Sequence, residues 1–336
     1  MTKETRTAYS FAWKLGMSLV ILAGALILSI VLGAKEITVQ DVWCAIFTDA
    51  SGEQLDIIRE IRLPREIGAL VTGSALAAAG AIMQGITRNP LADPGLLGLS
   101  AGANAALAIT VAILPSANYY GLMVACFVGA GFGALLVFGI GAAKKGGFSP
   151  FRIVLAGAAV TALLFAVAQG VGLLFKISQN VSLWTAGGLV GTTWKQLAAI
   201  GPFIAAGLFI AIVLSKQLTV LSISEEVAVG LGQKTFAVKA ILFVVIVLLT
   251  GASVALAGNL AFVGLLVPHI VRGITGSDYR FILPMSAVLG GAFMVFADTA
   301  ARMINAPYET PVAAVMAIAG LPFFLFIVNK GGRTFT

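Results

Sequence analysis

Residues 67–86, IGALVTGSALAAAGAIMQGI, form a run of small and mainly apolar side chains that decides the kind of protein. The hydrocarbon core of a bilayer is roughly 30 Å thick and an α-helix rises about 1.5 Å per residue, so one crossing needs about 20 mainly apolar residues. The whole chain has this character, because 59% of its 336 residues are hydrophobic, 10% are charged and the mean hydropathy is +1.02. This composition excludes an ordinary water-soluble globule and predicts an all-α, polytopic membrane protein.

Nine stretches have the length of a crossing within ordinary tolerance. A tenth, residues 260–271, has only 12 residues and includes Pro268 and His269. The predicted transmembrane helices cover residues 15–32, 67–86, 95–114, 119–143, 153–175, 197–214, 240–257, 260–271, 281–297 and 312–328.

The distribution of positive charge decides whether the short tenth stretch crosses. Short loops rich in Lys and Arg stay on the cytoplasmic side of a membrane. With the N-terminus inside and ten crossings, 14 of the 21 Lys and Arg residues fall inside and 7 outside. Without a crossing at residues 260–271 the division would be 11 to 10. The sequence therefore predicts ten helices in the cytoplasmic membrane, with both termini cytoplasmic.

Three arginines stand at three-residue intervals before the first run, in IREIRLPREIG, residues 58–68. Arg59, Arg62 and Arg65 fall outside in the ten-helix topology, against the general bias. One interpretation is a docking site for an external partner, and the alternative is contact with lipid headgroups. Pro64 is expected in the first helical turn, so that Arg65 enters the helix while Arg59 and Arg62 stay in the loop before it.

The sequence has no pattern typical of catalysis or of a charge relay. Asp298, near the outer end of a predicted span, is the ionisable residue that comes closest to an intramembrane position, and Arg302 is its expected partner. GLGQKT at residues 230–235 lacks the glycine that precedes the lysine of a phosphate-binding loop. Cys44 and Cys126 lie on different predicted elements and form no disulfide or metal-binding spacing. The sequence therefore predicts no enzyme activity, no bound metal and no cofactor.

The chain contains 39 glycines, and several stand four residues apart. GLSAG (98–102), GAGFG (129–133) and GGLVG (187–191) are examples. Small residues at this spacing let helix backbones approach closely, so these patterns predict tight packing within a helical bundle.

The predicted inner loop at residues 215–240, SKQLTVLSISEEVAVGLGQKTFAVKA, contains a short amphipathic helix. Ser224 is an expected N-cap, Glu225 and Glu226 place negative charge on the first turn, and Gly232 is an expected stop. Such a helix either rests on the membrane surface or contacts a soluble motor.

Seven separate motifs occur along residues 55–333 in a characteristic order and spacing. They are IRLPR (61–65), GAIMQGITRNPLADPGLLGLSAGA (80–103), LAGAAV (155–160), WTAGGLVG (184–191), LSISEEVAVGLG (221–232), SVALAGNLAFVGLLVPHIVR (253–272) and ADTAAR (297–302). Together they resemble the FecCD, or vitamin B12-type, permeases of binding-protein-dependent ABC importers, which take up iron siderophores, haem and cobalamin.

The resemblance implies a type II importer permease fold with ten helices per subunit. Two permease subunits, identical or paralogous, would form one pathway above two ATPase subunits, and ATP would be used by those partners rather than by this chain. An extracytoplasmic substrate-binding protein would dock through acidic residues on Arg62, Arg65 and Arg302. Arg59 has no counterpart in the family motif and is interpreted as an auxiliary charge.

The resemblance also assigns a coupling helix at about residues 224–232, which would contact the ATPase. The inner loop NPLADPG is interpreted mainly as a stiff turn, with ATPase contact as the alternative. His269 is interpreted as part of a broken helix rather than as a metal ligand. The expected coupling residues are Ser224, Glu225, Glu226, Val227, Gly230, Leu231 and Gly232, and those of the inner loop are Asn89, Pro90, Asp93 and Pro94.

The function expected from this resemblance is import of an iron(III)-siderophore, hydroxamate or catecholate, by alternating access. Haem or cobalamin import by the same kind of permease is an alternative, and a secondary transporter or channel is a weaker one. The loop after residue 84 and the segment after residue 255 share an L-A-x-x-G-L-L core, which predicts an inverted repeat.

Overall fold

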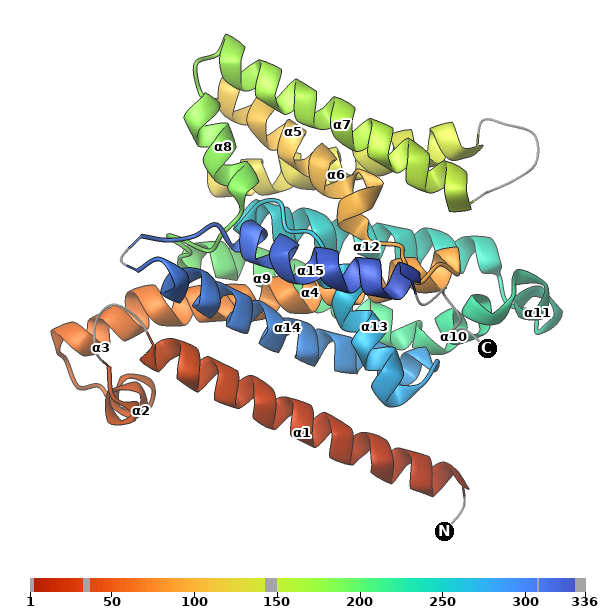
Figure 1. Cartoon of the computed structure of the whole chain (residues 1–336), viewed down its shortest axis with the longest axis horizontal. Helices are drawn as coiled ribbons and strands as arrows, with labels where there is room; N and C mark the ends of the chain where they lie inside the picture. Colours follow the sequence, from red (N-terminus) through yellow and green to blue (C-terminus); the bar gives the residue numbers. More distant parts are fainter. Residues whose placement is uncertain (1–2, 33–36, 143–149, 307, 330–336) are drawn as a thin grey trace.

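The computed structural model of the chain describes residues 3–32, 37–142, 150–306 and 308–329, and its regular elements in these ranges are helices (Figure 1). Ten of them are the apolar helices of the bundle: α1 (Lys3–Val31), α4 (Leu63–Thr87), α5 (Leu99–Ile113), α6 (Tyr119–Ala142), α7 (Pro150–Leu174), α9 (Trp194–Val213), α12 (Thr235–Ala257), α13 (Val263–Thr275), α14 (Tyr279–Ile304) and α15 (Val312–Asn329). The others are short: α2 (Val39–Phe47), α3 (Glu53–Ile57), η1 (Ile58–Arg62), η2 (Pro94–Leu97), α8 (Ser178–Ala186), α10 (Ser215–Ile223) and α11 (Glu225–Gly230).

Seven helices of the described chain are long and apolar enough to cross a bilayer, and α5, α13 and α15 are shorter apolar helices. The protein is therefore an all-α polytopic membrane protein. These ten helices fall on the ten stretches predicted from hydropathy. The number of crossings stays a prediction.

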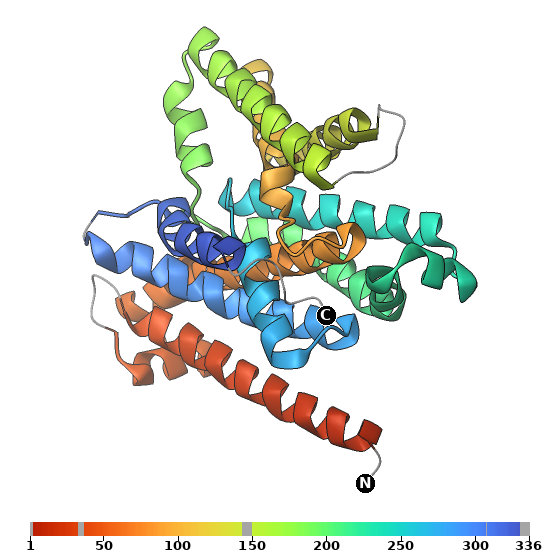
Figure 2. The same cartoon turned by 45° about the vertical axis from the view of Figure 1, so that its right-hand side comes forward.

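The centre of the bundle is α4, which packs against α14, α12, α13 and α9. Its apolar stretch is 83% buried, whereas that of α1 is 22% buried. On one side, α1 covers α14; on the other, α12 joins this group to α5, α6 and α7, as Figures 1 and 2 show. A helix that is enclosed all round needs small side chains, which explains the Gly- and Ala-rich sequence of α4.

Glycines form the closest helix crossings, as the spacing of small residues predicted. A methyl group added to Gly80 of α4 would lie 2.0 Å from the carbonyl oxygen of Gly264 in α13. The GLSAG and GAGFG patterns face each other, since a methyl group on Gly102 would lie 2.1 Å from the carbonyl oxygen of Gly129. The predicted packing role of these two patterns is confirmed.

The packing role predicted for GGLVG is wrong. Residues 187–191 lie in the connection between α8 and α9, where Gly187 and Gly191 have φ angles of +67° and +73°. Residues with side chains rarely adopt this left-handed region, so glycine serves here to turn the chain. The turn places Leu189, which is fully buried, beside Gly68 of α4.

The position predicted for Arg59 and Arg62 is also corrected. Both lie on η1, a π-helical turn that makes α3, η1 and α4 one continuous helix rather than a loop followed by a helix. The Leu63 N–H donates to the Ile58 carbonyl, five residues back. Pro64 has no N–H to give to the regular ladder, and a wider turn before it accommodates this loss.

The shortest apolar helix, α13, begins and ends later than the predicted residues 260–271. Gly258 and Phe262, with φ angles of +71° and +69°, separate it from α12. Its first turn lies against α4, where Gln84 Nε2 donates to the Gly264 carbonyl over 3.0 Å. A methyl group on Gly264 would lie 3.1 Å from Pro94 Cδ. The two L-A-x-x-G-L-L segments therefore meet inside the bundle.

Exchanging Gly80 for alanine tests the α4–α13 crossing. The added methyl group would meet backbone atoms that cannot move aside, so we expect Gly80→Ala to lower the unfolding free energy by about 1–3 kcal/mol or to prevent folding. Gly139→Ala is the matched control, since nothing lies within 4 Å of its added methyl group and the change should stay below about 1 kcal/mol. Thermal unfolding of the purified chains in detergent measures both, and equal effects would contradict the close crossing.

Candidate functional site

Arg65, in the first turn of α4, binds two carboxylates at once. Its Nε and Nη2 donate to Asp298 of α14 over 2.8 and 2.9 Å. Its Nη1 and Nη2 donate to Glu309, just beyond α14, over 2.7 and 3.1 Å. Such bidentate, charge-assisted bonds fix the orientation of all three side chains. Asp298 is completely buried, whereas the Glu309 side chain is 40% exposed.

Arg302, one turn after Asp298 on α14, connects the same group to α1. Its Nη2 donates to Glu66 Oε1 over 2.6 Å and to the Ser29 hydroxyl over 2.6 Å. Its Nε lies 3.3 Å from Asp298 Oδ2, so the expected pairing of Asp298 with Arg302 exists beside the stronger one with Arg65. We call Arg65, Glu66, Asp298, Arg302 and Glu309 the ion-pair network, and the end of the bundle that holds it the arginine end.

Arg62 is bonded to backbone at the same end. Its Nη1 donates to the carbonyls of Ile30 and Val31, in the last turn of α1. Helix ends leave carbonyls without intrahelical partners, and a guanidinium satisfies them well. Arg62 and Arg65 are only 7% and 9% exposed. The structure thus brings the three predicted docking arginines to one end and bonds each of them within the chain, and their docking role stays a prediction.

Arg59 fastens the end of α2 to η1. Its guanidinium donates to the carbonyls of Ala45, Thr48 and Ala50, where α2 ends and the chain turns toward α3. The Arg59 carbonyl accepts a 2.9 Å bond from Trp194 Nε1. Arg59 therefore has a structural role in joining α2 to η1, and its interpretation as an auxiliary charge stays a prediction.

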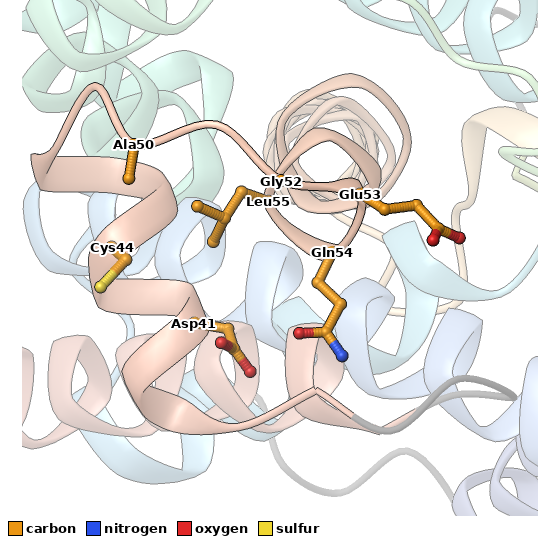
Figure 3. A pocket seen from close by; sticks show the side chains of 7 residues that line it. All are labelled: Asp41, Cys44, Ala50, Gly52, Glu53, Gln54 and Leu55. Carbon is orange, nitrogen blue, oxygen red and sulfur yellow. The ribbon is translucent and has the colours of Figure 1, made fainter.

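A hollow of about 530 Å³ lies between α2 and α3, near the carbonyls that Arg59 binds. Figure 3 shows Asp41 of α2 and Gln54 of α3 on opposite sides of it, while Glu53 points away from α2. Thr38 caps α2 and lowers the pKa of Asp41, first through its hydroxyl and then through its backbone N–H. Asp41 thus serves the local fold of α2, and no residue of the ion-pair network lines the hollow.

At the other end of the bundle, α11 lies within the segment predicted for coupling, and the coupling role itself stays a prediction. The Ser224 hydroxyl accepts the Val227 N–H over 3.0 Å, as expected of an N-cap. The helix ends at Gly230, earlier than the predicted residue 232. Gly232 has a φ angle of +78° and the following N–H, of Gln233, reaches back 2.9 Å to the Ala228 carbonyl. This closing turn satisfies carbonyls that the helix end would otherwise leave open.

The tip of α11 presents an apolar surface. Leu231 is 71% exposed, and Val227 and Val229 are exposed as well. Glu225 forms an ion pair with Lys239 of α12 over 2.6 Å. Of the two glutamates predicted to contact the ATPase, Glu225 thus already has a basic partner within the chain. The pKa of Glu226 is lowered by its own backbone N–H and by the Ser224 hydroxyl, with a further contribution from Arg88. Glu226 is therefore held charged beside the apolar tip.

The NPLADPG loop is built as a stiff turn. Asn89 Oδ1 accepts the Leu91 N–H over 3.0 Å, and Asp93 Oδ1 accepts the Gly95 N–H over 2.6 Å. Asp93 is buried, and Pro94 begins η2. These side-chain bonds to the next residues but one are typical of Asx turns. Pro90, between them, is half-buried.

A polar link that the sequence did not reveal joins α10 to α14. The Thr219 hydroxyl donates to Asp278 Oδ1 over 3.1 Å and accepts the Tyr279 N–H over 2.9 Å. Lys14 Nζ donates to the Ile274 carbonyl over 2.8 Å, so the first half of α1 also lies at this end. Nothing in the sequence pointed to this link, because its residues lie about 60 positions apart and meet only through the packing of α10 against α14.

His269 has an aromatic neighbour rather than a group of ligands. Its ring meets Phe323 of α15 edge to face, with 5.6 Å between the centroids. In the parts of the chain that the structure describes, no three His, Cys, Asp or Glu side chains gather in a way that could hold a metal ion.

The two carboxylates on Arg65 should differ greatly in their contribution to stability. Asp298→Asn leaves a buried guanidinium short of charge, so we expect a loss of about 3–5 kcal/mol of unfolding free energy. Glu309→Gln removes a half-exposed partner and should cost about 1 kcal/mol or less. Thermal unfolding in detergent separates them, and a larger effect of Glu309→Gln would contradict the buried position of Asp298.

Residues 20–330 match the FecCD transport family. Among curated proteins, the chain is 43% identical over 325 residues to the iron(3+)-hydroxamate import system permease protein FhuB of Bacillus subtilis, covering 95% of this chain and 85% of that protein. It is 35% identical over 317 residues to the ferric enterobactin transport system permease protein FepD of Escherichia coli, covering 94% of each. It is also 39% identical over 277 residues to the cobalamin import system permease protein BtuC of Halobacterium salinarum, covering 81% and 73%.

The fold matches that of a solved metal-chelate-type ABC transporter in an inward-facing conformation. The TM-score is 0.82 at 24% sequence identity, over 95% of this chain and 99% of that one. This likeness concerns the fold, whereas the match over residues 20–330 and the long alignments with permeases concern descent. The family predicted from the seven motifs is confirmed, and the chain belongs to the FecCD transport family.

Proposed function

We propose that this protein is the permease subunit of an ATP-driven importer that moves an iron(III)-siderophore across the bacterial cytoplasmic membrane by alternating access. The observation that carries the proposal is the 43% identity over 95% of the chain with a permease named for iron(3+)-hydroxamate import. The substrate passes through without reacting, and ATP hydrolysis belongs to separate subunits.

The proposed assembly contains a second permease subunit, paralogous or identical, two ATPase subunits and an extracytoplasmic binding protein. In it the ten apolar helices would all cross the membrane, as in a type II importer, with both termini cytoplasmic. The first half of α1 and the α10–α11 segment lie at one end of the bundle, and the arginines at the other, which supports this orientation. The chain itself supplies no cofactor site in this proposal.

At the arginine end, Arg62, Arg65 and Arg302 would receive acidic residues of the binding protein. The gathering of all three within contact of α1, α4 and α14 supports a common docking site. Opposite charges also speed the encounter of two proteins. The internal bonds of these arginines mean that docking acts on a network that is already assembled.

At the opposite end, α11 would transmit the motion of the ATPase. Val227 and Leu231 offer apolar side chains to a groove, with Glu226 charged beside them. The Thr219–Asp278 link would carry the displacement of α10 and α11 directly to α14. Arg88, the residue before the NPLADPG loop, contributes to the lowered pKa of Glu226, which supports a secondary contact of the loop with the ATPase.

Uptake by cells that express the complete importer tests the substrate. We expect radioactive iron to accumulate from a ferric trihydroxamate, with ferric triscatecholate, ferric citrate, haem and labelled cobalamin compared in parallel. The 39% identity to a cobalamin permease makes cobalamin the second candidate. Uptake of cobalamin or haem alone, with no iron chelate transported, would overturn the siderophore proposal.

A charge exchange tests whether Glu225 contacts the ATPase or serves only its internal pair. If the ATPase uses Glu225, Glu225→Lys should abolish uptake, and the double variant Glu225→Lys/Lys239→Glu should not restore it. If the pair with Lys239 is its whole role, the double variant recovers uptake because the 2.6 Å ion pair forms again in reverse. Membrane insertion of each variant is checked by the yield of folded complex.

A further inference from the structure

Arg65 holds its two carboxylates in very different surroundings. The edge formed by Nε and Nη2 faces Asp298, which is completely buried between helices. The edge formed by Nη1 and Nη2 faces Glu309, whose side chain is 40% exposed. The edge toward Asp298 is therefore enclosed by the bundle, whereas the edge toward Glu309 is covered by a side chain that is itself partly exposed.

Glu309 belongs to the short segment between α14 and α15, not to a helix. Among the described residues around it, backbone bonds join Tyr308 N to the Asn305 carbonyl over 2.9 Å and Thr310 N to the Ala301 carbonyl over 3.2 Å. Tyr308 is exposed. These bonds hold the backbone on both sides of Glu309. Its side chain can still turn away from Arg65 by rotation about its own bonds, without movement of α4 or α14.

Among the residues that the structure describes, Glu309 is one of only two carboxylates that Arg65 contacts directly. With Glu309 turned away, Asp298 would be the one of these two left in direct contact with this guanidinium. The Nη1 and Nη2 edge of Arg65 would then offer two N–H donors in a fork that fits one carboxylate.

We propose that Glu309 is an internal substitute for a partner carboxylate: an acidic side chain of the docking protein replaces it on the Nη1 and Nη2 edge of Arg65, while Asp298 keeps the buried edge. This inference rests on the proposed docking function. It identifies the contacted atoms and makes docking an exchange of one carboxylate for another. The exchange keeps the buried guanidinium paired throughout. It also lowers the apparent affinity for the docking protein, because only molecules in which Glu309 has left Arg65 can bind.

The test measures binding of the importer's own extracytoplasmic binding protein to the assembled transporter in lipid nanodiscs, over a salt series. Glu309→Gln removes the competitor, so we expect the Kd to fall roughly fivefold, the range in which a half-exposed ion pair acts. Glu309→Asp keeps the charge but shortens the side chain, and should tighten binding to a smaller extent. Glu60→Gln is the matched control, since it removes an exposed charge from η1 at the same end.

Arg65→Gln separates this inference from the proposed function, with thermal unfolding of each variant to verify folding. If Arg65→Gln weakens binding and Glu309→Gln strengthens it beyond Glu60→Gln, the exchange is supported. If Arg65→Gln weakens binding while Glu309→Gln equals Glu60→Gln, the exchange is overturned and docking on Arg65 stands. If folded Arg65→Gln binds as the unchanged protein does, both are overturned. Arg62→Glu, which keeps Arg65 and Glu309, then shows whether docking uses another arginine of this end.

Discussion

The bidentate pair between Arg65 and Asp298 is the interaction on which the arginine end depends. A guanidinium or a carboxylate alone in a buried, weakly polar place is very costly, so each tolerates its position only because the other is there. The pair fixes the position of α4 along the axis of α14. Arg302 links the same group of charges to Glu66 and to Ser29 of α1. Three helices that are far apart in sequence are thereby held in one register.

Close packing sets the rest of α4. Gly73 and Gly80 let the backbones of α14 and α13 approach so closely that a side chain would not fit. The ion pairs at one end hold the helices in one register. The glycine contacts along α4 form only in that register, so the two kinds of contact favour the same arrangement. A bilayer gives little apolar driving force between helices, so packing and polar contacts carry this specificity.

One helix, α14, connects the two ends of the bundle. Asp278 at its start joins Thr219 of α10, and Asp298, 20 residues later, joins Arg65. At about 1.5 Å per residue these two carboxylates are about 30 Å apart along the helix, the thickness of the hydrocarbon core. This helix thus spans the distance between the end that holds α10 and the arginine end.

Hydropathy and motif order alone determined the all-α membrane class and the family, because both depend on local composition and on residues in sequence order. They also located the Ser224 cap, since capping involves only neighbouring residues. Tertiary structure decided the rest. It turned residues 187–191 into a loop and placed Arg59 and Arg62 on a π-helical turn. It paired Arg65 with Asp298 and Glu309, more than 230 residues away, because which side chains meet across helices depends on the packing of the whole bundle.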